Sequence, residues 1–96
     1  MRERIMSMNK QAFLNSAGVQ VEILDFWLEQ RWLIPEQTAE GAAFSDIDLA
    51  RAHFITDLKA GLGVNDEGVD VILHLVDQLH GLRRALEQAQ RNVGAT

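Results

Sequence analysis

The hydrophobic and polar positions of this 96-residue chain predict four helices and one short hairpin. The first helix is expected at about residues 9–17, because Asn9 can cap its N-terminus and Gly18 can end it. The second is expected at about residues 20–32, where apolar residues recur at helical spacing and so share one face. The predicted buried face consists of Ile23, Leu24, Trp27, Leu28 and Arg31.

Residues 33–44 have a different pattern, which predicts a small β-hairpin or a loop of that shape. The residue before Pro35 avoids the helical region, and a Thr-Ala-Glu-Gly run can supply the turn. A third helix is expected from Ser45, which can form a capping box with Asp48, to about residue 60. Its predicted buried stripe consists of Ile47, Ala50, Phe54 and Leu58.

A long helix is predicted over about residues 66–92. Gly63 can adopt the left-handed conformation that ends the preceding helix, and Asn65 can cap the long one. The first half of the long helix is expected to pack on its own domain, and the second half to expose a narrow apolar stripe. The whole helix follows a heptad repeat with two polar breaks, in the order Val69, Ile72, Val76, Leu79, Arg83, Leu86, Gln90 and Val93, and the exposed part of this repeat is expected to include Leu86 and Val93.

An exposed stripe of this kind favours self-association over the alternative, a frayed C-terminus. We therefore predict a homodimer whose contacts are made by the last helix. The predicted dimerisation residues are Leu79, Leu82, Leu86 and Val93.

The composition is typical of a folded, soluble chain. Hydrophobic residues make up 47% and charged residues 24%, which is globular rather than disordered. The chain contains no cysteine, so it can form neither a disulfide nor a thiolate metal site. Its first residues show no signal-peptide pattern, and no apolar run approaches the roughly 20 residues that span a bilayer. We expect a cytoplasmic protein without a membrane segment.

The negative charge is concentrated in the middle of the chain. The net charge is −5, but residues 22–77 hold twelve acids and three bases, a net of −9, whereas each flanking segment carries +2. Such a centre would repel a phosphate backbone, because nucleic-acid binding depends on Lys and Arg. A basic protein is therefore the expected partner, and nucleic acid is not.

The sequence offers no pattern of catalytic or metal-binding residues. His74 and His80 are six residues apart, about 120° around a helix, and His53 lies on another predicted helix. Zinc would need at least a third ligand, and neither a nucleophile pattern nor a glycine-rich phosphate loop is present. We predict no catalytic residue, no metal site and no cofactor, and we do not expect an enzyme.

The order of the elements resembles the winged-helix domain of the MerR regulators. The similarity covers residues 9–80 and includes a Gly-Val turn before the second helix, the short hairpin and the run Leu62-Gly-Val-Asn. It implies a mainly α-helical, winged helix-turn-helix fold with a β-hairpin wing and a long C-terminal helix. In one domain of residues 1–96, the winged part would cover residues 9–64 and a dimerising helix residues 65–93.

In MerR regulators the helix after the Gly-Val turn binds DNA through arginines and tyrosines. The corresponding stretch here is Val21-Glu-Ile-Leu-Asp-Phe-Trp-Leu-Glu29, with acids at all three arginine positions. These acids share one helical stripe, which has an aromatic residue at its centre. The alternative is an ordinary solvated helix face. We predict a partner-binding surface that consists of Glu22, Asp25, Phe26 and Glu29.

A non-DNA-binding branch of this fold is more similar. The chain resembles the CbpM family of chaperone modulators in its size, its acidic second helix and the acidic and apolar run from Leu62 to Asp77. The resemblance implies binding to the J domain of a DnaJ-like, CbpA-type co-chaperone, and inhibition of its activity with the Hsp70 chaperone DnaK. The alternatives are a dimeric MerR-type DNA-binding transcriptional regulator and a dimeric adaptor for another basic protein.

Overall fold

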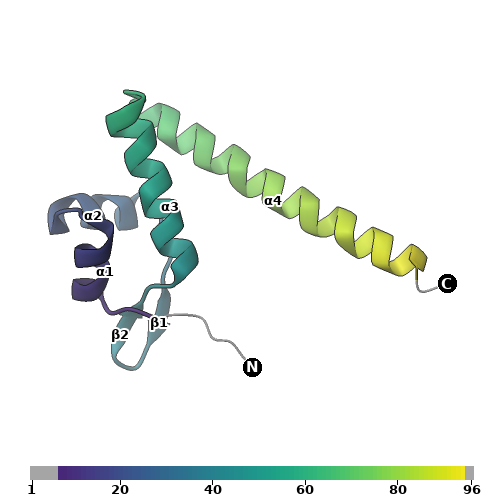
Figure 1. Ribbon diagram of the computed structural model, residues 1–96, viewed down its shortest axis with the longest axis horizontal. Helices are drawn as coiled ribbons and strands as arrows, with labels where there is room; N and C mark the ends of the chain where they lie inside the picture. Colours follow the sequence, from purple (N-terminus) through teal and green to yellow (C-terminus); the bar gives the residue numbers. More distant parts are fainter. Residues whose placement is uncertain (1–6, 95–96) are drawn as a thin grey trace. The chain divides into compact units, whose positions relative to one another are not determined.

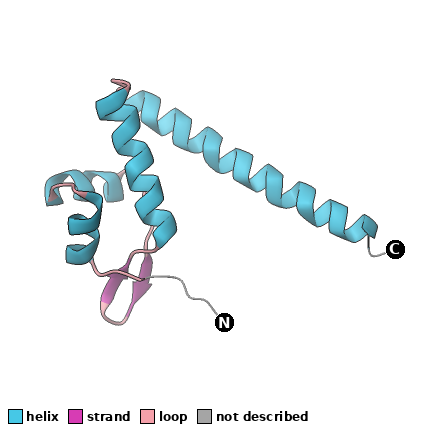
Figure 2. Cartoon of the chain, viewed as in Figure 1, coloured by secondary structure: helices cyan, strands magenta, loops and turns pink. Residues whose placement is uncertain are grey.

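The computed structural model describes residues 7–94 and divides the chain into two compact units, the first ending at Gly63. The described part of the second unit is one helix, α4 (Asp66–Gly94). The predicted mainly helical, winged helix-turn-helix fold is confirmed, whereas one domain over residues 1–96 stays a prediction (Figure 2). The described elements of the first unit are α1 (Lys10–Ala17), α2 (Val21–Glu29), β1 (Glu36–Thr38), β2 (Gly41–Ala43), α3 (Asp46–Thr56) and the π-helical turn η1 (Asp57–Gly61) (Figure 1).

Side-chain caps define where three of the helices begin, as the sequence indicated. The Asn9 side chain accepts a hydrogen bond from the first turn of α1 at 2.8 Å, and Asn65 does the same for α4 at 2.8 Å. Ser45 and Asp48 form the predicted reciprocal capping box at the start of α3. α2 begins without a side-chain cap, because Gln20 makes no such hydrogen bond.

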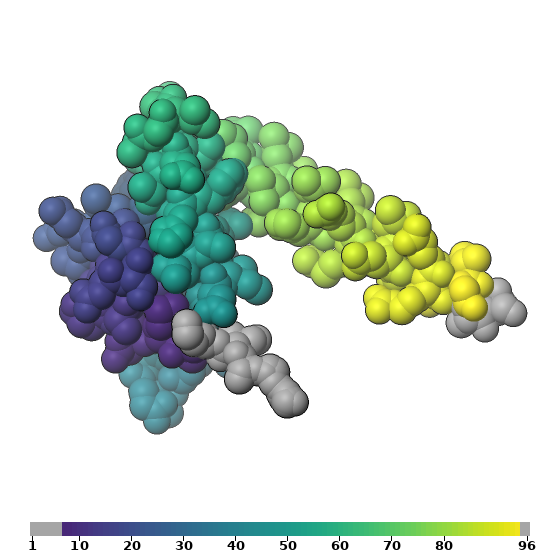
Figure 3. All heavy atoms as spheres, viewed as in Figure 1, coloured from purple at the N-terminus to yellow at the C-terminus, as the bar shows by residue number. Residues whose placement is uncertain are grey.

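The buried core of the first unit is centred on a pair of aromatic rings. Phe13 of α1 stacks on Phe44, with ring centroids 4.3 Å apart and both side chains fully buried. Met8 pairs with Phe44 as an isolated β-bridge, so the segment before α1 is tied to the chain before α3. α1 and α3 are in contact, as Figure 3 also shows. The remaining buried hydrophobic residues of this unit are Leu24, Trp27, Trp32, Leu33, Ala52, Ile55 and Leu58.

The predicted hairpin is confirmed. β1 and β2 pair antiparallel, with Glu36 opposite Ala43 and Thr38 opposite Gly41. The Thr38 hydroxyl donates to the Gly41 carbonyl at 2.8 Å and so closes the turn. The Arg51 guanidinium of α3 donates to the backbone carbonyl of Trp32, which holds the chain that enters the hairpin.

The buried face predicted for α2 is partly wrong. Leu24 and Trp27 are buried as expected, but Ile23 is 43% exposed and Arg31 is exposed as well. α2 has only nine residues, and Ile23 lies about 100° around the helix from Leu24. A short helix that buries a narrow face therefore leaves Ile23 outside it.

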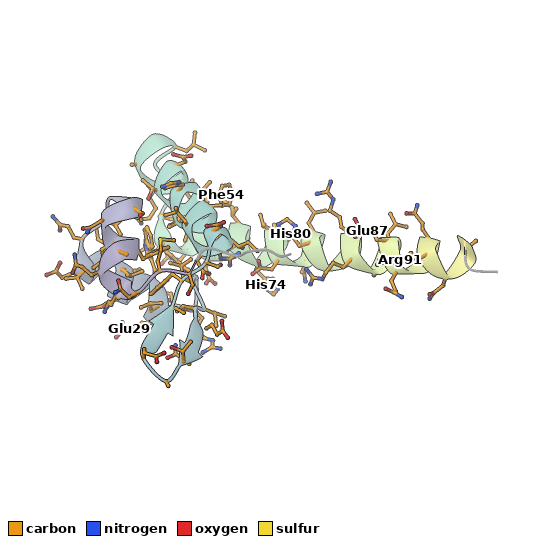
Figure 4. The ribbon with its side chains drawn as sticks, turned by 60° about the horizontal axis from the view of Figure 1, so that its bottom comes forward. Glu29, Phe54, His74, His80, Glu87 and Arg91 are labelled. Carbon is orange, nitrogen blue, oxygen red and sulfur yellow. The ribbon has the colours of Figure 1, made fainter. Side chains whose placement is uncertain are left out.

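The stripe predicted for the third helix is also wrong, except at Leu58. Ile47 is 76% exposed and Phe54, labelled in Figure 4, is 37% exposed. The fully buried residues of α3 are instead Ala52 and Ile55, and Leu58 is the one member of the predicted stripe that is buried. α3 carries apolar residues on two sides, and periodicity alone does not tell which side meets the core.

A π-helical turn follows α3, where the sequence predicted an ordinary helix to about residue 60. Leu62 N–H donates to the carbonyl of Asp57, five residues earlier, at 3.0 Å. Gly63 then adopts a left-handed conformation with φ of 71°, as predicted, and Gly18 does the same after α1.

α2 ends in the same left-handed conformation on a residue that is not glycine. Arg31 has φ of 62°, and its N–H donates to the Leu28 carbonyl at 3.1 Å. Trp32 N–H donates to the Trp27 carbonyl at 2.9 Å, so the two hydrogen bonds form a Schellman motif. A side chain in this region costs backbone free energy that glycine does not.

Replacing Arg31 with glycine should therefore stabilise the protein. Relief of the left-handed strain favours the variant Arg31→Gly, and the extra flexibility of glycine in the unfolded chain offsets part of the gain. We expect a net increase of up to about 1 kcal/mol in the free energy of unfolding, measured by chemical denaturation. Gly18→Ala, which adds a side chain at φ of 71°, should destabilise by a similar amount. Loss of stability in Arg31→Gly would contradict this account.

Candidate partner-binding surface

The outward side of α2 carries the three acids that the sequence singled out. Glu22, Asp25 and Glu29 are all exposed, and Glu22 lies in the first turn of the helix, where a negative charge is favourable. Glu29, labelled in Figure 4, is the last residue of α2. Their steps of three and four place them on one stripe about 10 Å long at the helical rise. We call this stripe the acidic face.

Phe26 lies beside these acids and is half-buried. Its ring meets the ring of Trp32 edge-on, with centroids 5.6 Å apart and an interplanar angle of 82°. Trp32 is 3% exposed, so this residue belongs to the core. Trp27 is also 3% exposed, which confirms its prediction as a core residue. Phe26 thus packs on the core residue Trp32 and is itself partly exposed at the surface.

Lys10 contributes a positive charge to this surface that the residue spacing does not indicate. Its Nζ atom lies 2.7 Å from Asp25 Oδ1, and the side chains of the two residues are 44% and 53% exposed. The residues are fifteen positions apart on α1 and α2, so no helical spacing rule pairs them. The central acid of the acidic face is therefore ion-paired within the chain.

Ile23, which the apolar pattern assigned to the buried face, is also part of this surface. It is 43% exposed and lies three residues before Phe26, next along the same side of α2. Together the two residues form an apolar strip beside the acidic face. From spacing alone, the apolar residues of α2 could form either of two buried faces, one with Ile23 and one without it. The burial of Leu24 and Trp27 shows that the buried face is the one without Ile23.

α4 buries one side near its start and exposes an apolar stripe along its length. Val69 is 0% and Leu73 is 3% exposed, whereas Leu75, about 160° around the helix from Leu73, is 57% exposed. The exposed stripe thus begins earlier than predicted, and it includes all four predicted dimerisation residues. We call it the α4 stripe: Val71, Leu75, Leu79, Leu82, Leu86 and Val93.

Within residues 7–94, no three His, Asp or Glu side chains are grouped so that they could hold a metal ion. His74 and His80, labelled in Figure 4, are both exposed on α4, and His53 is exposed on α3. Over the same range, no helix combines the length and the apolar character that crossing a membrane requires.

These features define a class of protein. The first unit is a winged helix-turn-helix, in which the second helix of the motif presents acids on its outward side rather than the basic residues that bind DNA. Residues 8–91 match the model of the family described as MerR HTH family regulatory protein, so the chain belongs to this family. A comparison with curated proteins gave no match.

The contact between Phe26 and Trp32 should contribute to stability. In Phe26→Leu we expect the free energy of unfolding to fall by about 1 kcal/mol, because an edge-on aromatic pair is worth roughly 0.5–1.5 kcal/mol beyond its buried area. Chemical denaturation, monitored by tryptophan fluorescence, measures this change. Ile23→Leu, which alters an exposed apolar residue on the same helix, should stay within about 0.5 kcal/mol of the parent protein. Equal losses in both variants would contradict the packing role of Phe26.

Proposed function

We propose that this protein is a chaperone modulator. It binds the J domain of a DnaJ-like, CbpA-type co-chaperone and lowers the activity of that co-chaperone with DnaK. One observation carries the proposal: Glu22, Asp25 and Glu29, which stand where the resemblance to DNA-binding MerR regulators implies arginines, are all exposed. A basic protein surface complements this face, and the second helix of the J domain is such a surface.

The proposed mechanism is competition for a surface and involves no catalytic step, metal ion or cofactor. The acidic face covers the basic helix of the J domain and thereby blocks its access to DnaK. Complementary charge accelerates and orients the encounter. Phe26 and Ile23 then supply the apolar contacts, because a few well-packed and desolvated residues, often aromatic, account for most of the binding energy in protein interfaces. We place this activity in the cytoplasm.

DNA binding is a poorer explanation for the same surface. Residues 21–29 and 36–43, which form α2 and the hairpin, contain five acids and neither Lys nor Arg. Phosphate contacts depend on such bases, and their number sets the salt dependence of binding. A mobility shift of duplex DNA that weakens steeply with salt would contradict the proposal.

We further propose that the protein acts as a homodimer through the α4 stripe. Residues 66–77 of α4 contain four acids and no Lys or Arg, whereas residues 78–94 contain three arginines and one glutamate. An antiparallel pair of α4 helices therefore places the acidic half of each copy against the basic half of the other. A parallel pair would set like charges side by side.

Reversing two charges of the acidic face should weaken binding to the J domain. In Glu22→Arg/Glu29→Arg the face changes from attracting to repelling a basic helix, and we expect at least a tenfold loss of affinity at low salt. Asp25 is left unchanged so that its contact with Lys10 persists. Titration calorimetry with the purified J domain measures the affinity, and the stimulation of DnaK ATPase by the full co-chaperone measures inhibition.

The matched control places the same two reversals elsewhere. Glu40 lies in the hairpin turn and Glu87 is exposed on α4, so Glu40→Arg/Glu87→Arg gives the same net charge outside α2. The control should keep most of the affinity. An equal loss in both double variants would show that net charge alone matters, and an absence of binding by the parent protein at low salt would reject the proposed function.

A charge within the α4 stripe should separate the dimer. Leu86 is 59% exposed, and Leu86→Glu would place a carboxylate in the interface, where an unpaired buried charge is strongly unfavourable. We expect this variant to sediment as a monomer in analytical ultracentrifugation. Gln88→Glu adds the same charge about 160° around the helix and should leave the dimer intact. A parent protein that is monomeric at micromolar concentration would contradict the proposal.

A further inference from the structure

We infer that Lys10 lowers the affinity of the acidic face for a basic partner. Its ammonium group is ion-paired with the Asp25 carboxylate, and a cation of the partner must replace it there. This inference rests on the function proposed above. It makes Lys10 a specificity-determining residue of the partner-binding surface, although it belongs to a different helix from the other members.

The local structure holds Lys10 at this place. Lys10 is the first residue of α1, directly after the capping residue Asn9. Phe13, one turn later, is fully buried against Phe44, which fixes α1 in the first unit. The ammonium group therefore reaches Asp25 from a defined position, and the 2.7 Å contact is the length of a charge-assisted hydrogen bond.

The contact lies at the centre of the acidic face. Asp25 follows Glu22 by three residues and precedes Glu29 by four, so the ammonium neutralises the middle charge of the stripe. With Lys10 in place the surface presents two uncompensated acids and one paired acid. A partner must bring a cation that competes with Lys10 for Asp25, or it must bind with only the two outer acids.

The exposure of both side chains makes this exchange possible. An ion pair in which each partner is about half accessible is weak and readily replaced, because water and salt screen it. Arginine offers a carboxylate two parallel N–H donors, which a lysine ammonium cannot match. The face should therefore select a basic helix that presents arginine, or several lysines, over one that presents a single lysine.

Removal of Lys10 tests the inference directly. In Lys10→Met the Asp25 carboxylate is unpaired, and we expect binding of the purified J domain at low salt to tighten about twofold to fivefold, the range for an exposed ion pair. Lys59→Met changes the net charge equally, from −5 to −6, but in η1 rather than on the face, and its affinity should not change. Circular dichroism and thermal melting check that both variants stay folded.

A second pair of variants identifies the partner of Lys10. In an Asp25→Asn background the carboxylate is absent, so adding Lys10→Met should have no further effect on affinity. A gain that persists in this background would overturn the inference, because Lys10 would then act through general charge. Equal gains in Lys10→Met and Lys59→Met would overturn it for the same reason.

A second probe separates failure of this inference from failure of the proposed function. The probe is a synthetic helical peptide with arginines and leucines at three- and four-residue spacing, titrated against the same variants. If the J domain does not bind but the peptide binds Lys10→Met more tightly, the proposed function fails and the role of Lys10 stands. If the J domain binds the parent and Lys10→Met equally, the role of Lys10 is rejected and the proposed function stands.

Discussion

The stacked rings of Phe13 and Phe44 are the contact on which the first unit depends. The two rings are fully buried, and Met8 pairs with the backbone of Phe44, so one point joins the start of α1 to the chain between β2 and α3. Loss of a buried phenylalanine costs roughly 3–5 kcal/mol, a large share of the stability of a domain of this size. Because α1 carries Lys10, the same contact also positions the cation that reaches the acidic face.

The sequence predicted those features of the structure that depend on residues close together in the chain. It did not predict the features that depend on how the helices pack. The caps at Asn9, Ser45 and Asn65 were predictable, because a capping side chain bonds to backbone within three residues of itself. The exposed acids of α2 followed from helical spacing. The exposure of Ile23 could not be predicted from helical spacing, because an apolar residue at the margin of a short helix fits either the buried face or the exposed face. The pairing of Lys10 with Asp25 depends on the tertiary arrangement of two helices, which no spacing rule contains.

The winged helix-turn-helix fold does not depend on the exposed side chains of α2, so the charge of these side chains can change without loss of the fold. Leu24 and Trp27 hold α2 in place from the inside, whereas Glu22 and Glu29 are exposed and lie outside that buried contact. Acids can therefore stand at the exposed positions of α2 at little cost in stability. Membership of the MerR family defines the fold, whereas the surface residues determine which kind of partner it binds.

The π-helical turn η1 has a consequence for changes in chain length. Each of its hydrogen-bonded loops spans one residue more than an α-helical loop, as the bond from Leu62 to Asp57 shows. Deletion of one residue within Asp57–Gly61 would let the turn close in the ordinary α pattern. Residues on either side would keep their own hydrogen bonds. The segment that ends the first unit is thus a place where this fold can absorb the deletion of a single residue.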